Sequence, residues 1–193
     1  MKKHTELEVK YKMENGDMFS FKRFVESEFA VERFEYVTGP DYYFVKPESG
    51  EAIRYRVPSY QKEKGELTIK QKKTAENNIN RIEVNIPLKN PSIEDVTKFV
   101  GLLGYELNFA IIKDCVVFEL SDCVMAYYSV AEIGGSKPPL HFIEVEIKEE
   151  VVDSLSEDEA WGVLRYYESK LSAIGISPQR RVKKSLYEIF KKG

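Results

Sequence analysis

The sequence contains very few residues that bind soft metals or form disulfides. Its two cysteines, Cys115 and Cys123, have neither CxxC nor zinc-finger spacing and are too few for a disulfide framework, so we expect reduced thiols. Its two histidines, His4 and His141, each lack a partner at metal-ligand spacing and are interpreted as strand-end residues. These scarcities argue against zinc-finger and disulfide-stapled classes of protein.

Long hydrophobic runs and an excess of charge of one sign are also missing. The start, Met1 to Glu6, leads into alternating charge, which is unlike a signal peptide, and no stretch is long enough to span a bilayer. The formal net charge is only -3, so no general binding to nucleic acid or to a membrane is expected. We expect a cytoplasmic protein.

Charged residues are plentiful, at 32% of the chain, beside a hydrophobic fraction of 42%. A chain of 193 residues is long enough for one sizeable core and short for two, so a single domain over residues 1–193 is predicted. Much of the charge must then lie on strand faces.

Two strands, one near each end of the chain, alternate between charged and apolar residues. In residues 5–12, Glu6, Glu8 and Lys10 share one face, and in residues 141–148 Glu144 and Glu146 do the same. A single strand of this kind is usually an edge strand with a solvated face. Two E-x-E strands, however, can bring four carboxylates together.

The middle strands repeat the alternation with basic residues. Residues 52–57 place Arg54 and Arg56 on one face, and residues 67–72 place Lys70 and Lys72 there. Residues 81–86 carry Arg81 and Glu83 on one face. The charges are therefore sorted by strand instead of being mixed at random.

Further elements follow from periodicity and turn residues. Strands are predicted at 42–45, 109–118 and 123–131, with a turn at 38–41, a polar hairpin loop at 60–65 and an ambiguous stretch at 29–37. Helices are predicted at 18–27, 92–103 and 157–174, the last two with capping boxes that begin at Ser92 and Ser156.

About eight alternating strands with a few helices predict an α+β fold, in which an antiparallel β-barrel has flanking helices. If the barrel is closed and its charged faces point inward, like charges crowd together and need compensation. A polyphosphate chelated to a divalent metal supplies both missing charges, because carboxylates suit Mg²⁺ or Mn²⁺ while Arg and Lys neutralise phosphate.

These motifs resemble the CYTH, or triphosphate tunnel metalloenzyme, superfamily, which includes class IV adenylate cyclases, thiamine triphosphatases and inorganic triphosphatases. The resemblance covers nearly the whole chain. It rests on E-x-E-x-K at Glu6 to Lys10, D-x-Y at Asp41, the basic strands, R-x-E at Arg81, Gly104-Tyr105 with Lys113, the late E-x-E at Glu144, and an ending similar to the family's at Lys184 to Glu188.

The resemblance implies an eight-stranded closed tunnel and a role for each charged residue. On the metal side it places Glu6, Glu8, Glu83, Glu144 and Glu146, with Mg²⁺ or Mn²⁺ as the cofactor. On the triphosphate side it places Lys10, Arg54, Arg56, Lys70, Lys72, Arg81, Lys113, Arg181 and Lys183. Lys10, Glu6 and Glu8 are the residues expected at the catalytic centre.

The chain departs from the family pattern at three places. It reads Lys113-Asp114-Cys115 where many relatives have K-x-R, an aspartate is replaced near Tyr128, and Leu186 stands where the terminal tyrosine is usual. Three functions remain open: metal-dependent hydrolysis of a triphosphate such as ATP or inorganic triphosphate, cyclisation to a cyclic nucleotide and pyrophosphate, and nucleotide binding without catalysis. Hydrolysis is the prediction, because it requires no base or ribose held in register. The sequence does not indicate an oligomeric state.

Overall fold

The computed structural model describes residues 4–14, 18–59, 64–72, 80–89 and 92–191, and side chains within these ranges except at 4–6, 70–72 and 80–83. The described residues contain eight strands. They are β1 (His4–Met13), β2 (Arg33–Val45), β3 (Ala52–Arg56), β4 (Lys64–Lys72), β5 (Asn80–Lys89), β6 (Glu106–Glu119), β7 (Cys123–Glu132) and β8 (Leu140–Ile147). The predicted strands at both ends and in the middle of the chain are confirmed.

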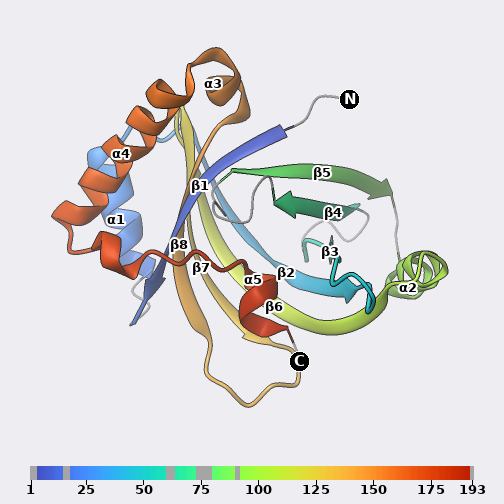
Figure 1. The fold of residues 1–193 in the computed structure, drawn as a ribbon. Coiled ribbons are helices and arrows are strands. Elements are labelled where there is room, and N and C mark those ends of the chain that lie inside the picture. The colour runs from blue at the N-terminus through green and yellow to red at the C-terminus, as the bar shows by residue number, and fades with distance from the viewer. Residues whose placement is uncertain (1–3, 15–17, 60–63, 73–79, 90–91, 192–193) are drawn as a thin grey trace.

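The strands form one antiparallel sheet in the order β1-β5-β4-β3-β2-β6-β7-β8. The sheet curls so that β1 lies between β5 and β8 (Figure 1). Residues 7–13 of β1 pair with β8, whereas only residues 4–7 pair with β5. The predicted eight-stranded antiparallel sheet is therefore confirmed, as a curled sheet whose two edges meet over this short stretch.

One predicted turn is wrong. Residues 38–41 do not turn but lie in the middle of β2, a strand of 13 residues. The backbone N–H groups of Val57 and Ser59 donate to the carbonyls of Pro40 and Thr38, so the chain after β3 packs directly on this part of β2. A Cβ at Gly39 would lie 2.3 Å from the Val57 carbonyl oxygen. Gly39 and Pro40 thus allow a second stretch of backbone to lie close to β2. In the sequence, the same two residue types resemble a turn signal.

The described helices flank the sheet. They are α1 (Met18–Glu28), α2 (Ile93–Leu102), α3 (Glu149–Ser154), α4 (Glu157–Ala173), the 3-10 turn η1 (Pro178–Arg180) and α5 (Leu186–Phe190). The three predicted helices are confirmed, and the Ser156 capping box has both of its hydrogen bonds. None of these helices is long and apolar enough to cross a membrane.

The alternation of the strands divides the structure into an outer core and an interior. On the outside, α1 and α4 pack against the apolar faces of β1, β7 and β8, including Leu7, Val9 and Tyr11 (Figure 1). Helix α2 covers β2, β3 and β4 in a second cluster. Helix α5 packs in a third cluster with Tyr43, Phe109 and neighbouring side chains of β6 to β8, and its first turn lines the interior. The outer packing of α1, α2 and α4 leaves the charged faces of β1, β3 and β8 directed inward.

Candidate active site

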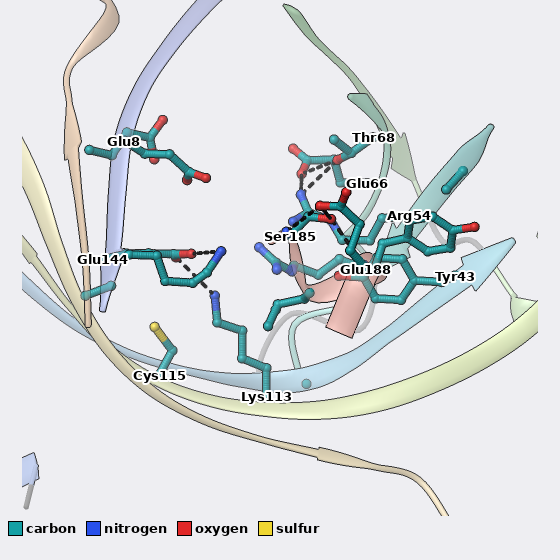
Figure 2. A pocket seen from close by; sticks show the side chains of 18 of the residues that line it. Glu8, Tyr43, Arg54, Glu66, Thr68, Lys113, Cys115, Glu144, Ser185 and Glu188 are labelled. Carbon is teal, nitrogen blue, oxygen red and sulfur yellow. Dashed lines mark hydrogen bonds and ion pairs between the residues drawn. The ribbon is translucent and has the colours of Figure 1, made fainter. Parts of the chain in front are cut away.

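The curled sheet encloses a cavity of about 720 Å³. Its lining includes the predicted site residues Glu8, Lys10, Arg54, Arg56, Lys113, Glu144 and Glu146. Figure 2 shows Glu8 and Glu144 on one side of this cavity, and Arg54 with Thr68 and Glu66 on the other. Residues from β1, β3, β6 and β8 are thus brought together, although they are up to 138 residues apart in the chain.

Glu144 is the centre of an ion cluster inside the cavity. Its Oε1 lies 3.1 Å from the Lys10 Nζ and accepts a hydrogen bond of 2.8 Å from the Tyr128 hydroxyl, while its Oε2 lies 3.9 Å from the Lys113 Nζ. Burial works against the charge of Glu144, but Lys10 and Lys113 outweigh it and hold the pKa of the carboxyl well below its usual range. Glu144 is therefore a carboxylate with its own counter-ions.

Lys113 is held from two directions. Its Nζ lies 3.7 Å from the centre of the Tyr128 ring, in a cation–π arrangement, in addition to its approach to Glu144. Burial lowers the pKa of Lys113, whereas the nearby Glu144 acts in the opposite direction. Tyr128 thus contacts both the Glu144 carboxylate and the Lys113 ammonium group.

Glu8 and Glu146 form the acidic end of the cavity. They are directly opposite each other in the register of β1 and β8, two positions along from the pair Lys10 and Glu144. Both line the cavity. Two carboxylates at directly opposed positions offer hard oxygen ligands, of the kind that a divalent cation binds, at this end of the cavity.

Two arginines of β3 form the basic side. Arg56 donates from Nε and Nη2 to the two oxygens of Asp41, each at 2.7 Å, and Asp41 is fully buried. Burial opposes the charge on Asp41, but Arg56 lowers the pKa of this carboxyl below its usual value. Register explains the pair, because Asp41 and Arg56 are opposite each other in β2 and β3.

Arg54 is held by Thr68 at 2.9 Å and lies 3.6 Å from the Glu66 carboxylate. Its Nε is buried and has no acceptor among the described residues. A buried donor without an acceptor is unfavourable, so an anionic ligand at this position would stabilise the site. Arg54 lines the cavity that such a ligand would occupy.

Five of the predicted site residues have side chains outside the part of the chain whose side chains are described. They are Glu6, Lys70, Lys72, Arg81 and Glu83. The backbone register pairs Glu6 with Arg81, Lys70 with Glu83, and Lys72 with Arg81. Their places in β1, β4 and β5 agree with the predicted strands, and their roles stay predictions.

The two predicted phosphate ligands near the C-terminus lie elsewhere. The Arg181 guanidinium bonds the Glu168 carboxylate, which also accepts from the Tyr11 hydroxyl, on the α4 side of β1. Lys183 is exposed and is absent from the described cavity lining. The chain crosses β1 here, with the Val182 N–H donating to the Lys10 carbonyl, and this crossing directs Arg181 outward.

The residues after this crossing reach the cavity instead. Ser185, Tyr187 and Glu188 belong to its lining, and α5 begins with a capping box formed by Ser185 and Glu188. The sequence contained that capping pattern, but it carried no signal that the helix would enter the site. Cys115 also lines the cavity, and burial raises the pKa of its thiol.

The acidic end of the cavity suits a hard divalent metal. The described residues include no cluster of three or more His, Cys, Asp or Glu side chains able to hold a metal. Glu8 and Glu146 supply two opposed carboxylates, and Mg²⁺ is often held by one or two carboxylates, with waters and substrate phosphates completing its shell. The donor set at this end therefore fits Mg²⁺ or Mn²⁺, while Glu144 is occupied by its lysines.

Comparison with solved structures shows that the fold is a known one. A conserved hypothetical protein from Pyrococcus furiosus has a TM-score of 0.73 and 23% identity, over 96% of this chain and 99% of that chain. A candidate adenylate cyclase from Vibrio parahaemolyticus has a TM-score of 0.64 and 20% identity, over 97% of this chain and 98% of that chain. The RNA triphosphatase Pct1 of S. pombe has a TM-score of 0.50 and 12% identity, over 91% of this chain and 86% of that chain.

No family model matches the sequence, and no curated protein matches it. The structural likeness, at these identities, shows the fold. The resemblance to the triphosphate tunnel proteins, drawn above from motifs, is thereby confirmed at the level of the fold.

Proposed function

We propose that this chain hydrolyses a triphosphate substrate, with Mg²⁺ or Mn²⁺, in the cavity of the curled sheet, which acts as a tunnel. One observation carries the proposal: the lining of a single cavity contains an opposed carboxylate pair, Glu8 and Glu146, two register positions from Lys10, together with Lys113 and Arg54. A metal-bound polyphosphate has this division of charge. The shared fold with a candidate adenylate cyclase and an RNA triphosphatase indicates which reactions to test.

The cations of the lining would bind the phosphates. Lys10 and Lys113 are positioned by Glu144, and Arg56 is positioned by Asp41 through only two of its N–H donors. Arg54 has a buried Nε–H that requires an acceptor. Because counter-ions already fix these side chains, little rotamer entropy is lost when phosphate oxygens bind. Lys70, Lys72 and Arg81 remain predicted additions to this set.

Glu8 and Glu146 would hold the metal, with Glu6 and Glu83 as predicted neighbours. When bound, the ion supplies positive charge that neutralises phosphate oxygens and polarises the substrate. In the proposed reaction a water oxygen attacks the terminal phosphorus, the bond to the bridging oxygen breaks, and the diphosphate part leaves with that electron pair. The water proton passes to solvent. Lys10 and Lys113 would stabilise the charge that develops on the phosphate oxygens.

The test is to incubate the purified protein with ATP, and separately with inorganic triphosphate, in the presence of Mg²⁺ or Mn²⁺. Anion-exchange chromatography then separates the products. The proposal predicts ADP with phosphate, or phosphate released from triphosphate. Cyclic AMP with diphosphate would replace hydrolysis with cyclisation, and metal-dependent ATP binding without product would indicate a binding module.

A matched pair of variants guards against a contaminating phosphatase. Lys113→Met removes a cation from the cavity, and Lys22→Met removes one from the exposed surface of α1. Activity that belongs to this cavity falls at least about tenfold in the first variant and stays near the wild-type rate in the second. An equal rate in all three preparations would contradict the proposal.

A further inference from the structure

A set of polar side chains connects three neighbouring strands on the basic side of the cavity. In the sheet register, Arg54 of β3 is directly opposite Thr68 of β4, and Thr68 is directly opposite Asn85 of β5. Directly opposed residues share one face of a sheet, and Figure 2 shows Arg54 and Thr68 together at the cavity. Thr68 is the middle residue of the three and is only 1% exposed.

The hydrogen bonds of Thr68 run in one direction. The Arg54 Nη2 lies 2.9 Å from the Thr68 Oγ1, and a guanidinium can only donate, so the threonine oxygen is the acceptor. The single hydroxyl proton then has two acceptors within reach, the Asn85 Oδ1 at 2.7 Å and the Glu66 Oε1 at 3.2 Å. The shorter contact assigns the proton to Asn85. Thr68 therefore accepts from the arginine and donates to the amide.

The two arginines of β3 are held by groups of different charge. Arg56 donates twice to the Asp41 carboxylate, which neutralises much of its positive charge. Arg54 donates to a hydroxyl, and the Glu66 carboxylate lies 3.6 Å away and is 39% exposed, so that water screens it. A neutral partner fixes the guanidinium without cancelling its charge. Arg54 is thus the arginine of this pair that keeps its charge for an anion in the cavity.

We propose that Thr68 is a positioning residue for the substrate: its hydroxyl, oriented by Asn85, holds the Arg54 guanidinium at the cavity and leaves its positive charge for a phosphate group. This inference rests on the proposed function and adds to it a residue that acts only through Arg54. Without the hydroxyl, the arginine would lose its fixed orientation, and the neighbouring Glu66 carboxylate would compete with phosphate for it. Phosphate binding should then weaken although no charge has been removed.

The test variant is Thr68→Val, which keeps the shape of the side chain and removes the hydroxyl. Thr68→Ser retains the hydroxyl and serves as the rescue. The matched control is Thr97→Val, because Thr97 is exposed on α2 and outside the described cavity lining. Thermal unfolding checks the folding of each variant. If Thr68→Val does not fold, Asn85→Ala decides the outcome, since Asn85 is exposed and its loss turns the Thr68 proton toward Glu66.

The measurement is the Kd of inorganic triphosphate by isothermal titration calorimetry in EDTA, so that metal-dependent turnover does not interfere. We expect Thr68→Val to weaken binding at least about fivefold and Asn85→Ala at least about threefold, while Thr68→Ser and Thr97→Val stay within about twofold of wild type. In an Arg54→Met background, Thr68→Val should change the Kd by less than about twofold, because the group that it positions is absent.

A threonine with a merely structural role would give a different pattern. A weakening by Thr68→Val that persists in the Arg54→Met background, or wild-type affinity in Thr68→Val, would overturn the inference and leave the proposed hydrolysis standing. Where Asn85→Ala has to decide, wild-type affinity in that variant would overturn it in the same way. Absence of triphosphate binding by the wild type would also overturn the inference.

The product assay decides the proposed hydrolysis separately. The expected pattern of triphosphate binding, with no product formed once Mg²⁺ or Mn²⁺ is added, would support the role of Thr68 and overturn the hydrolysis.

Discussion

Glu144 and Glu146 lie two residues apart on β8 and line the same cavity, yet their surroundings differ. Glu144 is opposite Lys10, lies near Lys113 and accepts a hydrogen bond from Tyr128. Glu146 is opposite Glu8. One carboxylate of the E-x-E motif is therefore a counter-ion for lysines, and the other belongs to an acidic pair.

This difference shows that a motif does not assign one role to all of its residues. The sequence predicted Glu144 and Glu146 as equivalent metal ligands, because both occupy the same face of one strand. The cross-strand partner decides the role instead. On this account the metal belongs to Glu8 and Glu146, and the phosphates belong to the lysines that Glu144 positions.

The largest expected effect comes from the acidic pair. Glu8→Gln and Glu146→Gln should each reduce kcat/KM by at least about 100-fold, because each removes a carboxylate from the proposed metal site. The loss should shrink as Mn²⁺ is raised, since weaker binding is overcome by mass action. Steady-state assays over a Mn²⁺ series measure both quantities. Activity that is independent of the metal concentration in wild type and variants alike would refute this assignment.

The effects on stability should have the reverse order, with the larger loss at Glu144. Glu144→Gln leaves Lys10 and Lys113 without their counter-ion and should cost about 2 kcal/mol in the free energy of unfolding. Glu146→Gln changes a more exposed carboxylate, and its cost without metal should be smaller, below about 1 kcal/mol. Urea denaturation in EDTA measures both. Equal costs would show that the two positions do not differ.

Tyr128→Phe should have a smaller effect of the same kind. It removes the hydroxyl that donates to Glu144 but keeps the ring beneath Lys113, so a cost of about 1 kcal/mol is expected. The cost should decrease when Tyr128→Phe is made in the Glu144→Gln background, because a neutral amide is the weaker acceptor. A double-mutant cycle by urea denaturation gives the coupling. Additive costs would mean that Tyr128 acts independently of Glu144.

The smallest effect is expected at Lys183. This residue is exposed and outside the described cavity lining, so Lys183→Ala should change kcat/KM by less than about twofold. Lys113→Ala, which removes a cation from the lining, serves as the comparison and should cost at least about tenfold. A large loss at Lys183 would show that the sequence-based assignment of this lysine to phosphate was right.

Much of the fold could be predicted because alternation determines strands directly. Leu7, Val9 and Tyr11 formed an apolar set beside the set of Glu8 and Lys10, and the structure buries the first set under α4. The helix at 157–174 was equally clear, since its capping box and apolar stripe are local features. The turn predicted at 38–41 is wrong because Gly39 and Pro40 accommodate a close contact with residues 57–59, which lie outside this local stretch of sequence.

The site was predictable in composition but not in pairing. Strand alternation predicted that Glu8, Lys10, Arg54 and Arg56 share inward faces, and all four line the cavity, as does Lys113, which the family resemblance added. Which acid meets which base depends on strand order and register, and neither is encoded within a single strand. The outward position of Arg181 likewise depends on where the chain crosses β1.

The most direct test of the account is metal binding to the protein without substrate. Mn²⁺ would be titrated into wild type, Glu146→Gln and Glu144→Gln, with free Mn²⁺ followed by electron paramagnetic resonance. The account predicts that Glu146→Gln weakens Mn²⁺ binding at least about tenfold, whereas Glu144→Gln changes it less than about threefold. Equal weakening in the two variants, or weakening only in Glu144→Gln, would contradict the division of the cavity into a metal end and a phosphate end.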